Sequence, residues 1–356
     1  MHSPEIPQGG RAIVRLSDLV RKADAAKATQ GARAMTSNFA QSTPAPGEAA
    51  PSLADASRRE VALYQEARRE VARIVEAVGL GKPHGVDALL AVVPNLAESL
   101  ATGDGLLVQA LGGSETHLDL PGHMVNVAIF AIKIGQGIGY GEGDLRSLAQ
   151  VACVHDLGML SVPRSVLQRP GPLSADELAL LRQHPEKSYQ MLQSLGPELE
   201  WVARIALQEQ EREDGSGYPR GLKGDQIHEY AKIIGLADTY ESLTHARPYR
   251  KLRVPFEAVK AILNADRRSF QAKILKGLIQ GLSTFPVGSL VRLSSKEIAR
   301  VVATNPRFPL RPVVDILTGH QGDPLASPRR LDLAHNSLIY ITESGTIDEV
   351  GEPEAT

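Results

Sequence analysis

The chain has 356 residues and 42% hydrophobic side chains, which is enough to bury a large core, yet only 4% of its residues are aromatic. A formal net charge of −2 excludes a broad basic surface for nucleic acid or for an anionic membrane. The single cysteine, Cys153, excludes an internal disulfide framework.

Residues 1–52 are dominated by Ala, Ser, Pro, Gly and Gln, a composition typical of a disordered leader. The first residues lack a basic region followed by an apolar one, so we expect no secretory signal. The best apolar window, residues 125–134, contains Lys133 and is too short to span a bilayer. We therefore expect a cytoplasmic protein without a membrane span.

A change of pattern at Leu53 predicts an amphipathic helix and linker over residues 53–82. Apolar residues recur at three- and four-residue spacing, as in Val61, Tyr64, Val71 and Ile74, while Arg and Glu fill the other faces. The apolar face predicts either packing on the main domain or a homodimer formed through residues 53–78.

The pattern of apolar residues over 83–285 predicts a helical domain. Helices are expected between residues 85 and 110, with a kink at Pro94, then over 122–134, 145–154, 199–212, 229–245 and 255–265. Ser174 with Glu177 three residues later is typical of a helix N-terminus, and we expect that helix to carry His184.

After residue 285 the apolar period changes to two, which predicts a small β appendage over 286–345 and a tail over 346–356. Short strands are expected at 289–293, 298–302, 311–317 and 338–341, separated by turn residues such as Asn305-Pro306. The fold class expected is therefore mainly α, a helical bundle followed by antiparallel strands.

Five short motifs in the helical region carry candidate chemistry. They are His155-Asp156 with Gly158, His184-Pro185, the turn Asp214–Pro219, Ala237-Asp238, and Arg247-Pro248-Tyr249-Arg250. Imidazole and carboxylate ligands together suit first-row divalent metals. A lone histidine on an apolar helix, such as His123, is more often a packed core residue than a ligand.

Taken in this order, the motifs resemble the HD-GYP family of HD phosphohydrolases, over roughly half of the chain. The resemblance implies metal-dependent hydrolysis of cyclic di-GMP to the linear dinucleotide or GMP, with Fe, Mn or a similar ion as cofactor. It implies a first metal site and two catalytic residues, His155 and Asp156. The ligands implied for that site are His123, His155, Asp156 and Asp238.

The same resemblance implies a second metal site and a substrate-binding surface. His184 matches a ligand of the second site, and Glu209 is the candidate beside it. Gly217, Tyr218 and Pro219 form the expected substrate turn, and Arg247 and Arg250 are expected to hold phosphates. Asp119, four residues before His123, is expected to cap a helix, with metal ligation as the alternative.

The sequence departs from the family at three positions. Glu209 and Gln210 stand where the family has two histidines, and Met159 stands where it has a lysine after the glycine. Gln210 is a weak ligand, so we expect residues 209–210 to be a polar, partly solvated helix end with at most a weak second site. A missing cationic contact costs about 2–4 kcal/mol of transition-state stabilisation.

Two functions follow from this pattern. The first is a cyclic di-GMP phosphodiesterase impaired by these substitutions. The second is a catalytically silent module that binds cyclic di-GMP or signalling proteins. A purely structural helical protein gives no reason for His155-Asp156 and Asp238 to occur together with an intact Asp214–Pro219 turn.

Overall fold

The computed structural model describes residues 53–82, 85–111, 119–169, 171–245, 254–265, 268–282, 285, 287–305, 308–336 and 338–345. The expected leader (residues 1–52), the tail (346–356) and the 247–250 motif lie outside the described residues. None of the described helices is both long enough and apolar enough to cross a bilayer.

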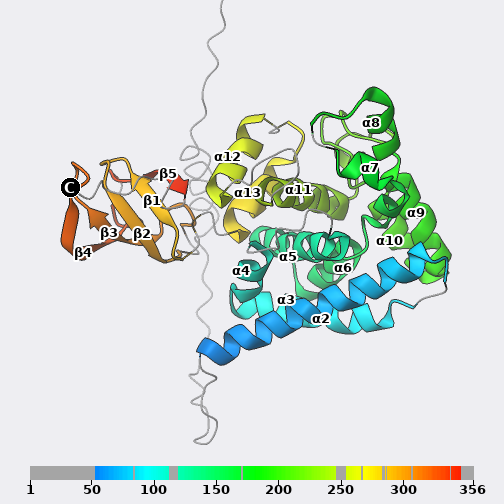
Figure 1. Ribbon diagram of the computed structural model, residues 1–356, viewed down its shortest axis with the longest axis horizontal. Helices are drawn as coiled ribbons and strands as arrows, with labels where there is room; N and C mark the ends of the chain where they lie inside the picture. Colours follow the sequence, from blue (N-terminus) through cyan, green and yellow to red (C-terminus); the bar gives the residue numbers. More distant parts are fainter. Residues whose placement is uncertain are drawn as a thin grey trace, which may run out of the picture. The chain divides into compact units, whose positions relative to one another are not determined.

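Helices form one bundle that is followed in the chain by a five-stranded sheet, so the expected fold class is confirmed (Figure 1). Apolar side chains from nearly every helix of the bundle share one core. The longer helices are α2 (Leu53–Gly79), α3 (Asp87–Thr102), α5 (Leu120–Ile138), α6 (Glu142–Ala152), α9 (His184–Leu195), α11 (Glu229–Thr244), α12 (Pro255–Ala265) and α13 (Ala272–Gly281). The shorter ones are α4 (Gly105–Leu111), α7 (Arg164–Leu167), α8 (Ala175–Leu181), α10 (Glu200–Ala206) and the 3₁₀ turns Leu157–Ser161, Pro197–Leu199 and Gly224–Gln226.

The centre of the bundle is α5, which packs against α2, α6, α11 and α13. It continues past the predicted end at Ile134 and stops at Gly139, whose φ of 89° is a left-handed cap. A Cβ at Gly137 would lie 2.4 Å from the Gly277 carbonyl oxygen of α13. The glycines that predicted a break therefore serve a close helix contact instead.

The apolar stripe of α2 is buried within the bundle itself. Ala67, Val71 and Ile74 are buried against α3, α4 and α5, and the Tyr64 hydroxyl donates to Asn126 Oδ1 of α5 at 2.8 Å. Packing on the main domain, one of the two expectations, is confirmed. A homodimer is not needed to cover this face.

Three other expectations about the helices need correction. His184 begins α9 rather than ending the helix capped by Ser174, because that helix, α8, stops at Leu181. The predicted helix 199–212 is α10 alone, and it ends at Ala206 because a turn follows it. Helix α13 is absent from the expected helices, although Ile274, Leu275 and Leu278 are buried at helical spacing.

The sheet is antiparallel with strand order β4-β3-β2-β1-β5. Its strands are β1 (Leu290–Leu293), β2 (Ile298–Ala303), β3 (Val313–Thr318), β4 (Pro324–Asp332) and β5 (Ile341–Gly345). The first three match expectation, and Val314 and Ile316 are buried on alternate positions. The sequence analysis missed β4 because most of its side chains are exposed, and it placed the last strand too early, at 338–341.

Candidate metal centre

Five segments of the helical bundle bring the candidate ligands together. His123 lies in the first turn of α5, and the turn after α6 carries His155 and Asp156. His184 is the first residue of α9, Glu209 lies in the turn after α10, and Asp238 lies on α11. Local sequence does not place these residues together, so the packing of the helices must do so.

Glycines at two contacts let these segments approach. A Cβ at Gly158 would lie 2.0 Å from the His184 carbonyl oxygen, and the Gly158 N–H donates to Ser188 Oγ at 2.8 Å. A Cβ at Gly235 of α11 would lie 2.3 Å from the Glu209 carbonyl oxygen. Any larger residue at either position would push two ligand-bearing segments apart.

The first cluster contains His123, His155 and Asp238, whose ligand atoms all lie within 4.8 Å of one another. His123 Nε2 is 3.4 Å from Asp238 Oδ1. The side chains of His123 and Asp238 are 12% and 19% exposed, so the cluster keeps an edge open to solvent. A ligand set of two imidazoles and one carboxylate is a usual one for catalytic transition-metal sites.

The second cluster contains Asp156, His184 and Glu209, and all three side chains are buried. His184 Nε2 is 2.9 Å from Glu209 Oε1 and 3.7 Å from Asp156 Oδ1. Burial opposes a charge on His184, but the two carboxylates outweigh it and raise the pKa of His184 to about 10. The expectation of a partly solvated helix end is wrong here, because Glu209 is only 1% exposed.

Asp156 faces both clusters. Its Oδ2 is 3.7 Å from His123 Nε2 in the first cluster, and its Oδ1 is 3.7 Å from His184 Nε2 in the second. Burial raises the pKa of Asp156 to about 6, although the neighbouring His184 and His155 lower it. A carboxylate between two ligand groups has the geometry of a bridging ligand.

Each of the three imidazoles has a protein oxygen within 2.9 Å of Nδ1, and its Nε2 faces the site. The Nδ1 of His155 lies 2.7 Å from the Ala152 carbonyl oxygen, and that of His184 lies 2.7 Å from the Leu181 carbonyl oxygen. The Nδ1 of His123 lies 2.9 Å from Glu241 Oε2. Second ring nitrogens tied in this way orient metal-binding histidines.

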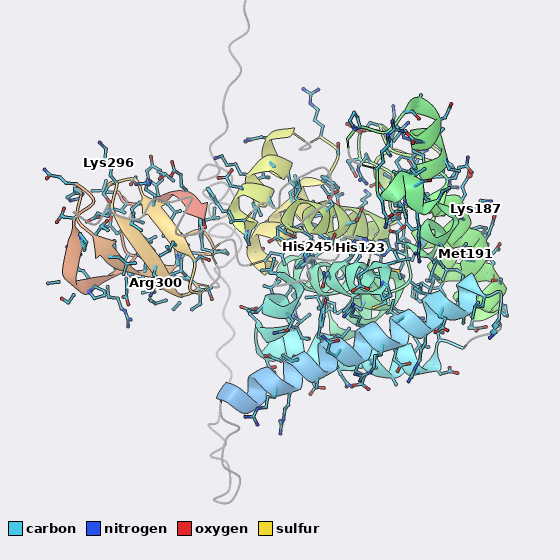
Figure 2. The ribbon with its side chains drawn as sticks, viewed as in Figure 1. His123, Lys187, Met191, His245, Lys296 and Arg300 are labelled. Atoms are coloured by element: carbon cyan, nitrogen blue, oxygen red, sulfur yellow. The ribbon has the colours of Figure 1, made fainter. Side chains whose placement is uncertain are left out.

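Glu241 is a site residue that sequence reasoning missed. It is 4% exposed and contacts both His123 and His245, the two labelled histidines of the helical bundle in Figure 2. The signal was its place three residues after Asp238 on α11, because that spacing puts two side chains on one helix face.

Gln210 links the two clusters by hydrogen bonds. Its Nε2 donates to Asp238 Oδ2 at 3.1 Å and lies 3.4 Å from Glu209 Oε2. Arg212 Nη2 donates to Gln210 Oε1 at 3.2 Å and so fixes the orientation of the amide. An amide that donates to carboxylates of both clusters acts here as a connector rather than as a ligand.

Two buried ligand atoms indicate that the residues fit a metal ion. His155 Nε2 and Asp156 Oδ1 are both buried, and neither has a hydrogen-bond partner among the described residues. Buried polar atoms without partners are costly, so they need a cation or another polar group. The donor set of imidazole and carboxylate is the kind that a divalent transition metal accepts.

The Asp214–Pro219 turn is held against the site by a second residue that the sequence analysis missed. Glu211 is 3% exposed, and its carboxylate accepts from the backbone N–H groups of Arg220 at 2.7 Å and Leu222 at 2.8 Å. A Cβ at Gly217 would lie 2.4 Å from the Arg212 nitrogen. Its neighbour in the turn, Tyr218, has its ring centroid 6.0 Å from that of His184.

Of the remaining predicted residues, Pro219 follows Tyr218 through a cis peptide bond. Arg247 and Arg250 lie outside the described residues, so their role stays a prediction. The expectation for Asp119 needs correction: it occupies the N-cap position of α5, but its side chain pairs with Arg68 of α2 and makes no capping hydrogen bond.

Comparisons with known families give matches to two regions of the chain. The model of the HD domain matches residues 114–274, and the model of a KOW domain associated with the HD domain matches residues 290–352. The first match contains both clusters, and the second covers the five-stranded sheet.

Curated relatives match about half of the chain. A cyclic di-GMP phosphodiesterase of Pseudomonas aeruginosa is 30% identical over 194 residues, which is 54% of this chain and 47% of the relative. A cyclic di-GMP phosphodiesterase response regulator of Xanthomonas campestris is 34% identical over 172 residues, 48% of this chain and 44% of the relative. The chain thus spans about half the length of these curated relatives.

A solved structure supports the same fold. The HDG"Y"P protein Bd1817 of Bdellovibrio bacteriovorus superposes with a TM-score of 0.52 at 19% identity, covering 63% of this chain and 71% of that one. The HD match thus places an HD domain at residues 114–274, the curated relatives are named as cyclic di-GMP phosphodiesterases, and the likeness to the solved structure shows a shared fold.

Proposed function

We propose that this chain is a metal-dependent phosphodiesterase that hydrolyses cyclic di-GMP to the linear dinucleotide and to GMP. The observation that carries the proposal is the pair of ligand clusters that share Asp156, with unpartnered buried atoms on His155 and Asp156. The names of the curated relatives supply the substrate class.

We assign a first divalent ion, iron or manganese, to His123, His155, Asp156 and Asp238, and a second to Asp156, His184 and Glu209. When bound, such ions acidify a water molecule and neutralise charge on a phosphoryl oxygen. Asp156 touches both ligand groups and holds them in a fixed relation. Glu241 holds the His123 ring with Nε2 toward the site.

The substrate side of the site is the turn at Gly217–Pro219. Glu211 fixes the backbone just after this turn, and the Tyr218 ring lies edge-on to His184. We assign phosphate binding to Arg247 and Arg250, because guanidinium groups pair with phosphate through two parallel hydrogen bonds.

A second candidate function is a silent receptor that binds cyclic di-GMP or a signalling protein without turnover. It is favoured by Met159, which follows Gly158 and offers no charge and no strong donor for a phosphate oxygen. In this function the two clusters hold cyclic di-GMP in place. The replacement of two histidines by Glu209 and Gln210 accounts for the loss of hydrolysis.

The experiment that separates these functions measures metal content and cyclic di-GMP turnover on the same sample of anaerobically purified full-length protein. If the chain is a phosphodiesterase, we expect about two ions per chain and release of the linear dinucleotide. Glu209→Ala should abolish that product, whereas the matched exposed variant Glu186→Ala of α9 should keep it. One ion or none, with no product after long incubation, contradicts the enzyme, and saturable cyclic di-GMP binding in that sample supports the receptor.

A further inference from the structure

A cavity of about 400 Å³ lies among α6, α10 and the start of α11. It is lined by four aromatic side chains, Tyr140, Trp201, His228 and Tyr230, and by the two carboxylates of Asp144 and Glu229. Its volume is in the range of small-molecule sites. Nothing in the proposed hydrolysis uses these residues.

The cavity is separate from the metal centre. Glu229 precedes Asp238 by nine residues on α11, which is about 13.5 Å along a helix that rises 1.5 Å per residue. Asp144 lies at the start of α6, whereas His155 and Asp156 follow the end of that helix. The two carboxylates of the cavity are therefore well separated from the ligands on their own helices, while Ile205 lines the cavity four residues before Glu209.

Hydrogen bonds to the carboxylates fix the two tyrosines. The Tyr140 hydroxyl donates to Glu229 Oε2 at 2.7 Å, and the Tyr230 hydroxyl donates to Asp144 Oδ1 at 2.9 Å. The two tyrosine ring centroids are 5.9 Å apart with planes at 59°, and the His228 and Tyr230 rings meet edge to face at 5.0 Å. The hydroxyls are thus committed to carboxylates, and the rings form a rigid aromatic wall.

Charge in the cavity favours a positive ligand. Lys273 pairs with Glu229 at 2.7 Å and lies 5.9 Å from the Tyr140 ring centroid, so these two residues already have a cation. Tyr230 is the only hydrogen-bond donor that Asp144 has among the described side chains. Burial lowers the pKa of His228, so its ring is neutral near pH 7 and does not repel a cation. The described lining residues include no lysine or arginine to hold a phosphate or a carboxylate.

A simpler account explains Asp144 alone. It lies in the first turn of α6, where a carboxylate complements the helix dipole. That account does not explain why aromatic rings surround the carboxylate, nor why Trp201 is 38% exposed beside them. Aromatic faces near an uncompensated carboxylate are the elements that recognise organic cations.

We propose that this cavity binds an organic cation, a guanidinium or a substituted ammonium group, placed over the aromatic rings with Asp144 as its counter-ion. The cation comes either from a free small molecule or from an arginine or lysine side chain of a protein. Both sources present the same chemistry to the cavity.

The test uses Trp201, which is the only tryptophan of the chain and therefore reports on this cavity alone. Full-length protein is titrated with methylguanidinium, tetramethylammonium and a blocked Gly-Arg-Gly peptide while tryptophan emission is followed. A saturable change with at least one of these cations is expected. Binding of the small cations identifies a free ligand, and at least tenfold tighter binding of the peptide identifies a protein side chain.

Asp144→Asn should weaken this binding at least about fivefold. Glu142→Gln is the matched control, because Glu142 also lies in the first turn of α6, pairs with Arg146 and does not line the cavity. No saturable change with any cation, an equal loss in both variants, or a response to GMP in place of the cations would overturn the proposal. Circular dichroism of each variant verifies that the bundle is folded.

Discussion

The two ligand clusters share Asp156 as a neighbour but differ in chemistry and exposure. The first cluster joins two imidazoles to one carboxylate and keeps an edge open to solvent. The second joins one imidazole to two carboxylates, and all of its side chains are buried. The first keeps the residues that the family resemblance implies, whereas Glu209 changes the second.

Glu209 stands where the family resemblance implies a neutral ligand, and the three candidate ligand atoms of the second cluster lie within 4.8 Å of one another. Glu209 takes the place of an imidazole and still reaches His184 at 2.9 Å. Without an ion, Asp156 and Glu209 raise the pKa of His184 to about 10, and the ring must release a proton before its Nε2 can bind an ion. A carboxylate-rich set favours a harder ion such as Mn²⁺.

The largest effect is expected where the two clusters meet. Asp156→Asn should remove both ions from the protein, because an amide cannot serve as a charged ligand to either cluster. We expect cyclic di-GMP turnover to fall by roughly 10²–10³-fold. Elemental analysis and a turnover assay check this, and a variant that keeps two ions would contradict the bridging role.

Two variants that each replace one carboxylate test the metal binding of the two clusters separately. Glu209→Gln should lower the metal content from about two ions to one by emptying the second cluster, and Asp238→Asn should empty the first. The metal content of the two variants is compared by titration with the metal, with calorimetry as the readout. If both lose both ions, the clusters form one indivisible site and the comparison fails.

A smaller effect is expected at Glu241, which touches His123 but lies behind the ligand atoms. Glu241→Gln should weaken metal binding at the first cluster by about 10–100-fold, because the ring loses the partner that orients it. The second cluster should keep its affinity. Equal weakening of both affinities would mean that the substitution disturbs the whole bundle.

The smallest effect is expected outside the site, where Ser174 and Glu177 cap α8 through reciprocal hydrogen bonds. Ser174→Ala should lower the free energy of unfolding by about 1 kcal/mol. Thermal denaturation measures this loss. Metal content should stay unchanged, since α8 ends before His184 begins α9, so a loss of metal here would show that the second cluster depends on the neighbouring helix.

Much of the fold could be predicted from periodicity and capping residues. Most helices, the apolar stripe of α2 and three of the five strands follow from spacing alone. The end of α5 could not be predicted, because Gly135 and Gly137 read locally as breakers. Only their close contacts, with Leu145 of α6 and with Gly277 of α13, show their use. The exposed side chains of β4 gave too weak an alternation to reveal a strand.

The candidate ligands could be named from the sequence because most lie in motifs of the family resemblance, and the structure brings them together in two clusters. The residues that hold them could not be predicted in the same way: Glu211 acts on backbone groups nine and eleven positions later, and Glu241 acts on a helix that lies far away in sequence. The solvation of Glu209 was predicted wrongly, because burial of the turn after α10 depends on how closely α11 packs at Gly235.

The amide of Gln210 donates to Asp238 in one cluster and lies within reach of Glu209 in the other. Any ion that pulls on one carboxylate therefore changes the hydrogen bonding of the other. If each cluster binds an ion, we expect the two affinities to be thermodynamically linked, with the linkage acting equally in both directions. Occupancy of one cluster should then change the affinity of the other through a side chain that is expected to bind neither ion.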